Sequence, residues 1–365
     1  MPLREKTRRP PPPSWIQAFL LVAAGGEREG GGPVPSRLRP AQAGELLRHA
    51  LAEGMGGLLR DLLRRRGLDA LLPEGERRFL ENLYYRAVAE NLRRLALIDE
   101  VERAFAARGG TAVVLQGAAL LFGTYPDPGL RPLTDVDLWA PEREKAREAL
   151  GAIGFAVEQA RPLVLRRGRD AIDLHADPLG AERIESRKHF LPRGAARILA
   201  ACRPLSPAHP RLLRLSPEDE MLYLAFHAAK HNLERLVWLA DLARLSRPWG
   251  EKEWRRLEQR ARELGAASLA PLAAALAGCP AGRLPAARGG LSVAARFLIR
   301  RRLKGRRLPA WAFLVLLRPA GIARRAAFLV ESIFPRPAVL CPGGGLKGVL
   351  RHHVRRAAGA LPGFP

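Results

Sequence analysis

The fold is decided by the stretch TAVVLQGAALLFGTYPDPGLRPLTDVDLWAP, residues 111–141. It opens with TAVVL, an apolar and β-branched run that is typical of a short buried strand. Gly117 then marks a turn into a short apolar helix over 118–122, and a loop rich in turn residues occupies 124–134. The run DVDLWA, residues 135–140, predicts a second strand. Strand, helix and strand in so short a span predict a small mixed sheet.

The residues after this stretch extend the same unit. Pro141 opens a helix that is expected to end near Gly151, since proline is favoured in the first helical turn. Two further strands are predicted over 162–167 and 171–176, with a polar turn between them. The pattern therefore predicts an α+β fold with a small mixed β-sheet at its core.

Helical periodicity surrounds this core on both sides. Leucines at three- and four-residue spacings indicate helix over 40–66, and a second apolar stripe runs over 74–108 as far as a Gly-Gly pair. On the other side, Ser216 followed by proline and acids is a strong helix start, and this helix is expected to reach about Arg247. More helices are expected over 251–277.

The chain is expected to divide into five segments. Helical regions flank the core, and the two ends of the chain are basic and rich in proline or glycine. The segments are 1–36, a disordered N-terminus with a short helix; 37–108, an N-terminal helical region; 109–180, the α/β core; 181–280, a helical region; and 281–365, a basic helical or irregular segment.

The composition excludes several classes of protein. Apolar residues make up 47% of the 365, too many for a chain that is disordered along most of its length. Three widely spaced cysteines exclude a small disulfide scaffold, and the lack of a Cys-x-x-Cys pair excludes zinc-ribbon and thiol redox sites. The odd cysteine count is consistent with a reducing compartment, so we expect a cytoplasmic protein.

The net charge of +25 is unevenly distributed. Residues 281–365 hold 17 basic residues against one acid, Glu331, and so carry most of the excess. Only seven of the 61 basic residues in the chain are lysines, so the excess is almost all arginine. The charge therefore indicates an anionic partner for 281–365 rather than a property of the core.

An apolar run from Trp15 to Ala24 follows the basic N-terminus. This order resembles a signal peptide, but the prolines at 10–13 and Gln17 fit one poorly, and the alternative is the first helix of a helical region. No run reaches the ~18 apolar residues that a membrane-spanning helix needs, so no transmembrane segment is expected.

Three aspartates are the candidate catalytic and metal-binding residues. Asp135 and Asp137 are two apart on a predicted strand, so both carboxylates point to the same face of the sheet. Asp173, on another predicted strand, could bring a third carboxylate beside them. Hard cations prefer such oxygen ligands, and Mg²⁺ typically binds one or two carboxylates together with substrate phosphates. The pattern predicts a two-metal site for Mg²⁺ or Mn²⁺.

A second candidate site is the turn Gln116–Gly117–Ala118. It joins a strand to a helix, and the free N–H groups at a helix N-terminus favour a phosphate. Gly117 would let the phosphate approach the backbone closely. Such turns are common, so the prediction depends on the aspartates that follow.

The order VVLQGAALL…YPDPGLRPLTDVDLWAP…ALGAIGF…AIDLHADP resembles the uncharacterised, predicted nucleotidyltransferases of the DNA polymerase β-like superfamily. The later HAAKHN, residues 227–232, with Trp238 and Asp241, looks like the same subfamily. The resemblance is densest over 111–180 and weaker over about 75–250. At the turn, members often carry Lys before the glycine and Ser or Gly after it, where this chain has Gln116 and Ala118.

The resemblance implies a metal-dependent transfer of a nucleoside monophosphate from an NTP to an acceptor, with release of pyrophosphate. The acceptor could be a small molecule, a protein or an RNA. Asp135, Asp137 and Asp173 would be the catalytic and metal-binding residues. The expected nucleotide-binding residues are Gln116, Gly117, Ala118, Arg131, His175 and Lys230.

Some of these residues have a purely structural alternative. Arg131 could bind a phosphate, replacing the charge of the missing Lys, or it could pair locally with Asp127 or Asp135. His175 lies two residues after an aspartate and would either line the site or be a buried, hydrogen-bonded histidine. Lys230 would either reach a phosphate or lie on a helix surface.

His227 and His231 are four residues apart on a predicted helix, but no Glu or Cys completes a set of metal ligands there. Asp241 is expected to hold helices together. The alternative function is a catalytically degenerate nucleotidyltransferase fold that binds nucleic acid or an anionic surface through its Arg-rich C-terminus.

Overall fold

A computed structural model of the chain describes residues 12–25, 37–158, 161–182, 184–192, 194–278, 290–319 and 321–333. It is a mixed helix-and-strand fold with a single described sheet, so the predicted α+β class is confirmed. The strands are β1 (Ala112–Leu115), β2 (Val136–Trp139), β3 (Ala156–Glu158), β4 (Arg161–Arg167), β5 (Asp170–His175), β6 (Arg203–Pro204) and β7 (Leu212–Arg214).

Helices precede, interrupt and follow these strands. Before β1 come α1 (Ser14–Ala23), α2 (Pro40–Ala52), α3 (Gly56–Arg65), the short η1 (Asp69–Leu71) and α4 (Glu74–Arg108). Among the strands lie α5 (Gln116–Leu120), η2 (Pro128–Leu130), α6 (Arg143–Ala152), η3 (Glu185–Phe190) and α7 (Gly194–Ala201). After β7 come α8 (Pro217–Lys230), α9 (Leu236–Leu245), α10 (Glu251–Glu263), α11 (Leu269–Gly278), α12 (Val293–Leu303), α13 (Ala312–Leu316) and α14 (Ile322–Ile333).

The sheet has the strand order β3-β4-β5-β2-β1-β7-β6. β2 pairs with β5 and β1 with β7 in parallel, and every other neighbouring pair is antiparallel. β7 pairs with β1 although it lies far along the chain, so the sheet extends past the boundary at 180 that was expected for the core. Neither β6 nor β7 was predicted, because runs of two and three residues are too short for a strand signal.

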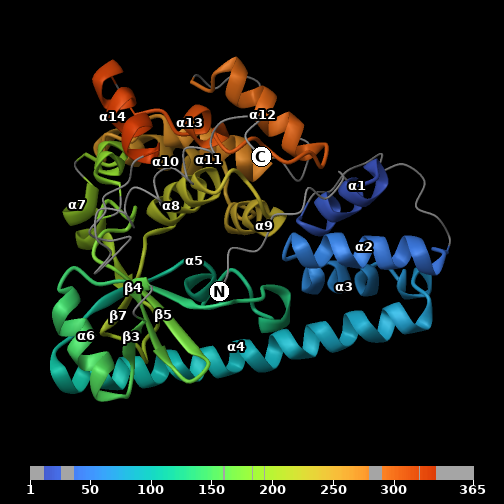
Figure 1. Cartoon of the computed structure of the whole chain (residues 1–365), viewed down its shortest axis with the longest axis horizontal. Coiled ribbons are helices and arrows are strands. Elements are labelled where there is room, and N and C mark those ends of the chain that lie inside the picture. The colour runs from blue at the N-terminus through green and yellow to red at the C-terminus, as the bar shows by residue number, and fades with distance from the viewer. Residues whose placement is uncertain are drawn as a thin grey trace, which may run out of the picture.

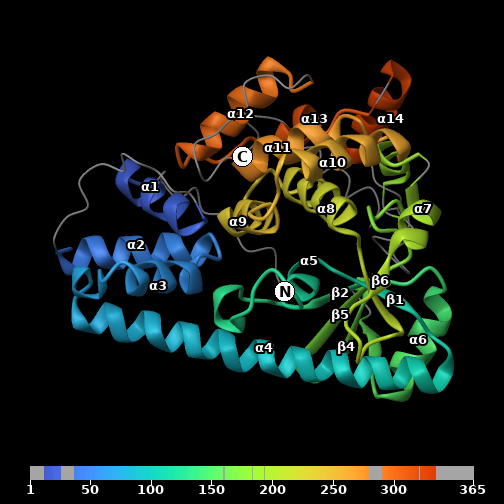
Figure 2. The same ribbon diagram turned by 180° about the vertical axis from the view of Figure 1, so that it is seen from behind.

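The two faces of the sheet pack on different helices. Val114, Val136 and Leu138 are fully buried in a core that includes apolar residues of α4 and α6. Val113 and Trp139 point the other way, as alternation along a strand requires, into the larger core that contains α8, α9 and α11. Figures 1 and 2 show the consequence: α4 crosses the base of the molecule, and α8 to α11 lie on the opposite side of the sheet.

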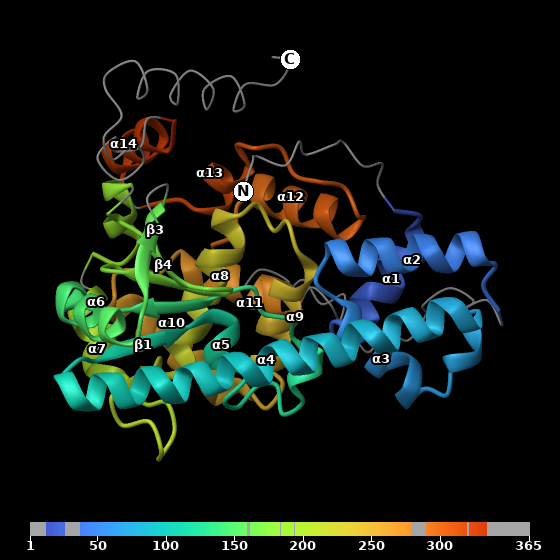
Figure 3. The same cartoon turned by 60° about the horizontal axis from the view of Figure 1, so that its bottom comes forward.

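α4 connects the sheet to the N-terminal helices. Figure 3 shows this helix running from the strands to α2 and α3, both of which it contacts. It ends where the Gly-Gly pair predicted, with Gly109 in the left-handed conformation at φ 77°. The predicted cap at Ser216 is also confirmed, since its hydroxyl accepts a hydrogen bond from the Asp219 N–H at 3.2 Å.

Two predicted helical stretches are each divided in two. The pattern over 40–66 forms α2 and α3, separated by a turn in which Gly54 has φ +72°. The helix expected from Ser216 to about 247 ends at Lys230, because Asn232 and Leu233 both adopt positive φ and start a new direction for α9. Apolar periodicity continues across both turns, so it could not reveal them.

The apolar run near the N-terminus forms α1, in which Ile16 and Leu20 are fully buried in the larger core. It is therefore the first helix of the N-terminal helical region, the second of the two interpretations given above. Within the described ranges, no helix has both the length and the apolar character needed to cross a membrane.

Candidate active site

Asp137 and Asp173 lie side by side on two parallel strands. β2 and β5 pair in a register that sets Asp137 opposite Asp173 and Trp139 opposite His175. Residues that are partners across a ladder share a face, so these side chains point to the side covered by α8. The predicted juxtaposition of two carboxylates on neighbouring strands is thus present.

His175 completes a compact group with these two carboxylates. Its Nε2 lies 3.4 Å from Asp137 Oδ1 and 3.6 Å from Asp173 Oδ1. Ligand atoms of the three side chains all lie within 4.8 Å of one another, a spacing at which they could bind one metal ion. We call Asp137, Asp173 and His175 the carboxylate cluster.

The charges of the cluster perturb one another. Burial opposes a charge on His175, but its contacts with Asp137, Glu182 and Asp173 outweigh burial and raise its pKa to about 10. Burial raises the pKa of Asp173, and the neighbouring Asp137 and Asp135 raise it further, against the effect of His175. Negative charge is therefore concentrated here, with an imidazolium partly neutralising it.

Among the residues that the structure describes, several polar atoms in and beside this cluster are buried without a hydrogen-bond partner. They include Asp173 Oδ1, His175 Nδ1 and both carboxylate oxygens of Glu182. The closest approach of His175 Nδ1 to Glu182 is 3.7 Å, which is long for a hydrogen bond. Buried polar atoms in proteins are normally paired, so the unpartnered carboxylate oxygens of Asp173 and Glu182 fit a site that binds a cation.

Asp135 lies at the edge of this group. It precedes β2, is exposed, and accepts a hydrogen bond from the Thr134 hydroxyl at 2.8 Å. Although the side chain is exposed, the partial desolvation of its carboxylate by neighbouring groups and the charge of Asp137 raise its pKa, so it lies within electrostatic reach of the cluster. Its predicted role as a third metal ligand stays a prediction, because the compact group consists of Asp137, Asp173 and His175.

The turn between β1 and α5 has an unusual backbone. Gln116 adopts φ +54°, a region that side chains rarely occupy, and its amide donates a hydrogen bond to the Tyr223 hydroxyl at 3.3 Å. A Cβ on Gly117 would lie 2.4 Å from Leu133 and 3.2 Å from Arg131 Cζ. Gly117 is thus needed for close packing of the loop, and phosphate binding by Gln116, Gly117 and Ala118 stays a prediction.

Arg131 is buried in an ion pair with Asp241 of α9. Its Nε and Nη2 both donate to that carboxylate at 2.9 Å, and Nη1 donates to a neighbouring carbonyl. Tyr125 donates its hydroxyl to the same carboxylate at 2.8 Å. The local pairs considered for Arg131, with Asp127 or Asp135, are not among its described contacts. The Arg131–Asp241 pair therefore holds the loop on α9. Binding of phosphate by Arg131 remains a prediction.

The rest of this loop is held by α4 and α3. Asn91, fully buried, donates its amide to the carbonyls of Pro128 and Arg131 at 2.6 and 2.8 Å. Tyr84 donates its hydroxyl to Asp127 at 2.8 Å. A Cβ on Gly129 would meet the Tyr84 ring at 2.1 Å, so the loop and α4 are in close contact. The DPGLR segment, residues 127–131, is therefore held by α9 on one side and by α4 on the other.

One side of α8 faces the carboxylates. Tyr223 is buried, and burial together with the charges of Asp137 and Asp173 raises the pKa of its hydroxyl. Lys230 is close enough for its charge to oppose the rise in the pKa of Asp173. Lys230 was predicted from the sequence as a site residue, whereas Tyr223 and Glu182 were not. Tyr223 could have been found from its spacing of seven residues before Lys230, which places both on one helix face.

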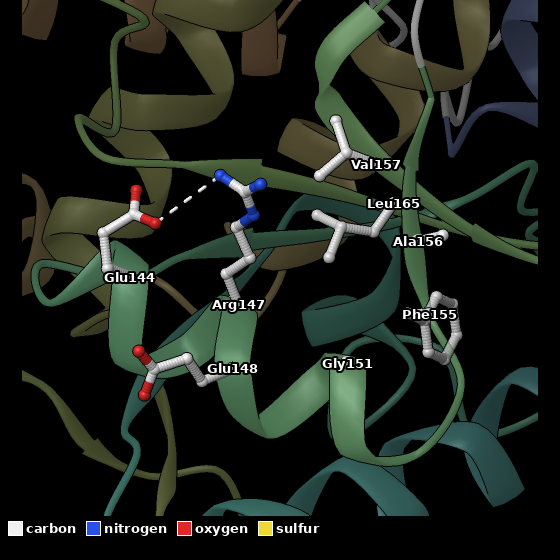
Figure 4. A pocket seen from close by; sticks show the side chains of 8 residues that line it. All are labelled: Glu144, Arg147, Glu148, Gly151, Phe155, Ala156, Val157 and Leu165. Carbon is white, nitrogen blue, oxygen red and sulfur yellow. Dashed lines mark ion pairs between the residues drawn. The ribbon is translucent and has the colours of Figure 1, made fainter.

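A separate pocket lies on the other face of the sheet. Its volume is about 470 Å³. Figure 4 shows the residues that line it, from α6 and the strands β3 and β4, and the Glu144–Arg147 ion pair among them. Leu165, which lines it, is the ladder partner of Ile172 and so faces away from Asp173. This pocket does not open onto the carboxylate cluster.

The predicted anionic partner of 281–365 is untested, because much of that segment lies outside the described residues. Within the described part, Arg302 of α12 is buried and donates to Glu53 and to the carbonyl of Leu233. At least one arginine of the basic excess therefore holds the fold together.

Comparison with known proteins agrees with this geometry. A family model described as an uncharacterised nucleotidyltransferase matches residues 39–282, more than half of the chain. The match contains α2 to α11 and every strand of the described sheet. No curated protein and no solved structure matches the chain.

Proposed function

The chain belongs to the family of uncharacterised nucleotidyltransferases, and from that premise we propose that it transfers a nucleoside monophosphate from an NTP to an acceptor hydroxyl. The acceptor oxygen would bond to the α-phosphorus, the bond from that phosphorus to the β-phosphate would break, and pyrophosphate would leave. The acceptor would be a hydroxyl of a small molecule, a protein or an RNA.

The observation that carries this proposal is the register of β2 on β5. It pairs Asp137 with Asp173 and brings His175 to within 3.6 Å of both carboxylates. Like charges are expensive to hold together under partial burial, and a fold that gains nothing from the pair would be more stable without it. Together with the unpartnered Asp173 Oδ1, this supports a bound divalent cation.

We propose Mg²⁺ or Mn²⁺ as that cation, with Asp137 and Asp173 as ligands and Asp135 beside them. When bound, the ion would stabilise charge on the reacting phosphates and favour ionisation of an attacking hydroxyl. The oxygen-rich ligand set is the one such hard cations prefer.

The chain's own residues would orient the substrates and move one proton. Asp173 would bind the cation through one carboxylate oxygen and accept the proton of the acceptor hydroxyl through the other. Lys230 and the backbone of the Gln116–Ala118 turn would contact the phosphates, and Tyr223 holds Gln116 through the hydrogen bond between them.

The test is transfer from labelled NTPs in the presence of Mg²⁺ or Mn²⁺ and candidate acceptors. We expect Asp137→Asn and Asp173→Asn each to lower the rate at least about 100-fold, because each removes a ligand charge. Glu144→Gln, at the pocket on the opposite face, removes a carboxylate in the same way and should leave the rate unchanged. Undiminished transfer by both aspartate variants would refute the proposal.

A second measurement separates metal binding from chemistry. A cation that binds only the folded chain raises its stability, by about 2.7 kcal/mol at 100 times Kd. Mn²⁺ should therefore raise the Tm of the wild type and of Glu144→Gln, but not of Asp137→Asn. An equal rise in all three would show that the ion binds elsewhere.

A further inference from the structure

Exposed apolar side chains are concentrated in the last described helices. They are Val293 and Phe297 on α12, Trp311 just before α13, and Ile322, Leu329 and Val330 on α14. Their exposed fractions run from 40% to 84%, and elsewhere in the described part of the chain only four large apolar side chains are exposed to this degree. Soluble proteins rarely gather exposed apolar side chains in one region unless that region binds a partner.

On α12, apolar and basic side chains share the exposed face. This face consists of four exposed side chains at three- and four-residue spacings: Val293, Phe297, Arg300 and Lys304. The opposite side of the helix packs in the larger core through Ala295, Leu298 and Ile299. The exposed side chains are therefore not the ones that hold α12 on the molecule.

α14 has the same division into two sides. Phe328 is buried against a phenylalanine of η3, with the two ring centroids 5.0 Å apart. Ile322, Leu329 and Val330 occupy positions i, i+7 and i+8 of the helix, which puts them on one face, and all three are exposed. α14 is thus attached through one side and presents a second, apolar side to solvent.

The charge around these side chains is positive. Residues 290–333 contain ten basic residues and one acid. That acid, Glu331, accepts a hydrogen bond from the Ser186 N–H of η3 at 2.7 Å, so its carboxylate is directed at η3. Figures 1 and 2 show α12, α13 and α14 together on the side of the molecule opposite α4. We call the exposed side chains of α12 and α14, with Trp311, the basic apolar surface.

We propose that the basic apolar surface binds an anionic lipid membrane. Its apolar side chains would enter the boundary between head groups and acyl chains, and its arginines and Lys304 would contact the lipid phosphates. Helices with one apolar and basic exposed face bind membrane surfaces in this way. Trp311 suits the same depth, because tryptophan has an apolar ring and a polar N–H.

Two other partners fit this surface less well. A nucleic acid would bind the cations through its phosphates, but it would leave the aliphatic side chains of both helices in water. A second copy of the chain would cover the apolar side chains, but it would bring two positive surfaces together. An anionic membrane provides both an apolar layer and negative charge. The surface follows residue 282, where the match to the family ends, so the proposal does not depend on nucleotide transfer.

The experiment is sedimentation of the full chain with lipid vesicles. One set contains phosphatidylcholine alone, and the other contains equal parts of phosphatidylcholine and phosphatidylglycerol. We expect binding to the anionic vesicles to be at least about tenfold tighter, and to weaken as salt is added, because the charges of both surfaces are then screened.

Removal of two apolar side chains is the sharpest test. We expect Phe297→Ser/Leu329→Ser to weaken binding to the anionic vesicles by at least about tenfold, since burial of apolar area contributes to membrane affinity. The control, Phe79→Ser/Leu92→Ser, removes the same two residue types from α4, on the opposite side of the molecule, and should bind like the wild type. All four side chains are exposed, so both variants should melt at the temperature of the wild type.

A second pair of variants tests the charge. Arg300→Gln/Lys304→Gln should weaken binding to the anionic vesicles by about tenfold. Arg64→Gln/Arg66→Gln removes the same charge from exposed positions at the end of α3 and should have less than about a twofold effect, because distant surface charges are screened.

Three results would overturn the proposal. The first is a wild type that does not bind the anionic vesicles, and the second is equal binding by the wild type and Phe297→Ser/Leu329→Ser. The third is tighter binding to poly(U) RNA than to the vesicles, unaffected by the two serines, which would make the surface a nucleic-acid site.

Discussion

Two polar clusters lie on either side of Asp135, and they differ in how completely their hydrogen bonds are made. In the first, which we call the loop cluster, Arg131 and Tyr125 both donate to Asp241, and all three side chains are buried. In the second, the carboxylate cluster, Asp173 Oδ1 and His175 Nδ1 have no hydrogen-bond partner within the described part of the chain.

This difference distinguishes charged side chains that hold the fold together from charged side chains that are able to bind a ligand. A buried ion pair with all its donors used gives a loop a single conformation and offers little to a ligand. A partly buried cluster with unused atoms and raised pKa values is unstable by itself and gains from a ligand that supplies what is missing. The sequence indicated chemistry at Asp137 and Asp173 and a structural role for Asp241, but the partners that complete each cluster appear only in the fold.

The largest effect should come from breaking the loop cluster. Asp241→Ala would leave the buried Arg131 without its counter-ion and Tyr125 without its acceptor, so we expect a loss of about 3–5 kcal/mol in the free energy of unfolding. Urea denaturation measures it. The double variant Arg131→Met/Asp241→Leu, which removes both charges, should recover much of the loss. A single variant as stable as the wild type would show that the pair does not hold the loop.

A smaller effect should come from the carboxylate cluster, and it should depend on pH. With metal chelated, the folded His175 has a pKa of about 10 against an ordinary 6.5, so the native state keeps a proton that the unfolded state releases. The stability from His175 is full below about pH 6.5 and is lost as the pH rises towards 10, and the loss between about pH 6 and pH 9.5 is roughly 4 kcal/mol.

We expect His175→Gln to reduce this pH-dependent loss in the free energy of unfolding. Urea denaturation at about pH 6 and pH 9.5 in chelator, on both proteins, measures the two slopes. Parallel slopes would mean that His175 is not the cation that balances the carboxylates.

The smallest effect concerns the contact between the loop and α4. Gly129→Ala puts a methyl group 2.1 Å from the Tyr84 ring, and forcing the ring aside should cost about 1–3 kcal/mol in the free energy of unfolding. Gly151→Ala, in α6 with nothing within 4 Å, is the matched control and should be neutral or stabilising by about 0.5–1 kcal/mol. Equal thermal shifts for the two variants would contradict this close packing.

Local patterns predicted those parts of the fold that depend on local chemistry. The strand at Val113, the cap at Ser216 and the stop at Gly109 follow from side chains and glycine at one point in the chain. The neighbouring positions of Asp137 and Asp173 were expected because each aspartate lies on its own predicted strand.

Long-range partners were not predictable in the same way. For Arg131 the sequence left open a contact with phosphate or a local pair, yet it pairs with a residue 110 positions away. Tyr223 and Glu182 reach the site only through tertiary packing, and β7 joins the sheet through three residues. No periodicity reports such contacts, because they depend on how whole elements meet.

The Arg302–Glu53 contact has a consequence for the order in which a nascent chain can become folded. It joins residues 249 positions apart, across nearly every element described above. During synthesis, Glu53 leaves the ribosome long before Arg302 does, so the turn after α2 must wait for α12 before this contact can close. Contacts so distant in sequence slow folding. This contact therefore depends on a helix that lies beyond residues 39–282, the part of the chain that matches the family.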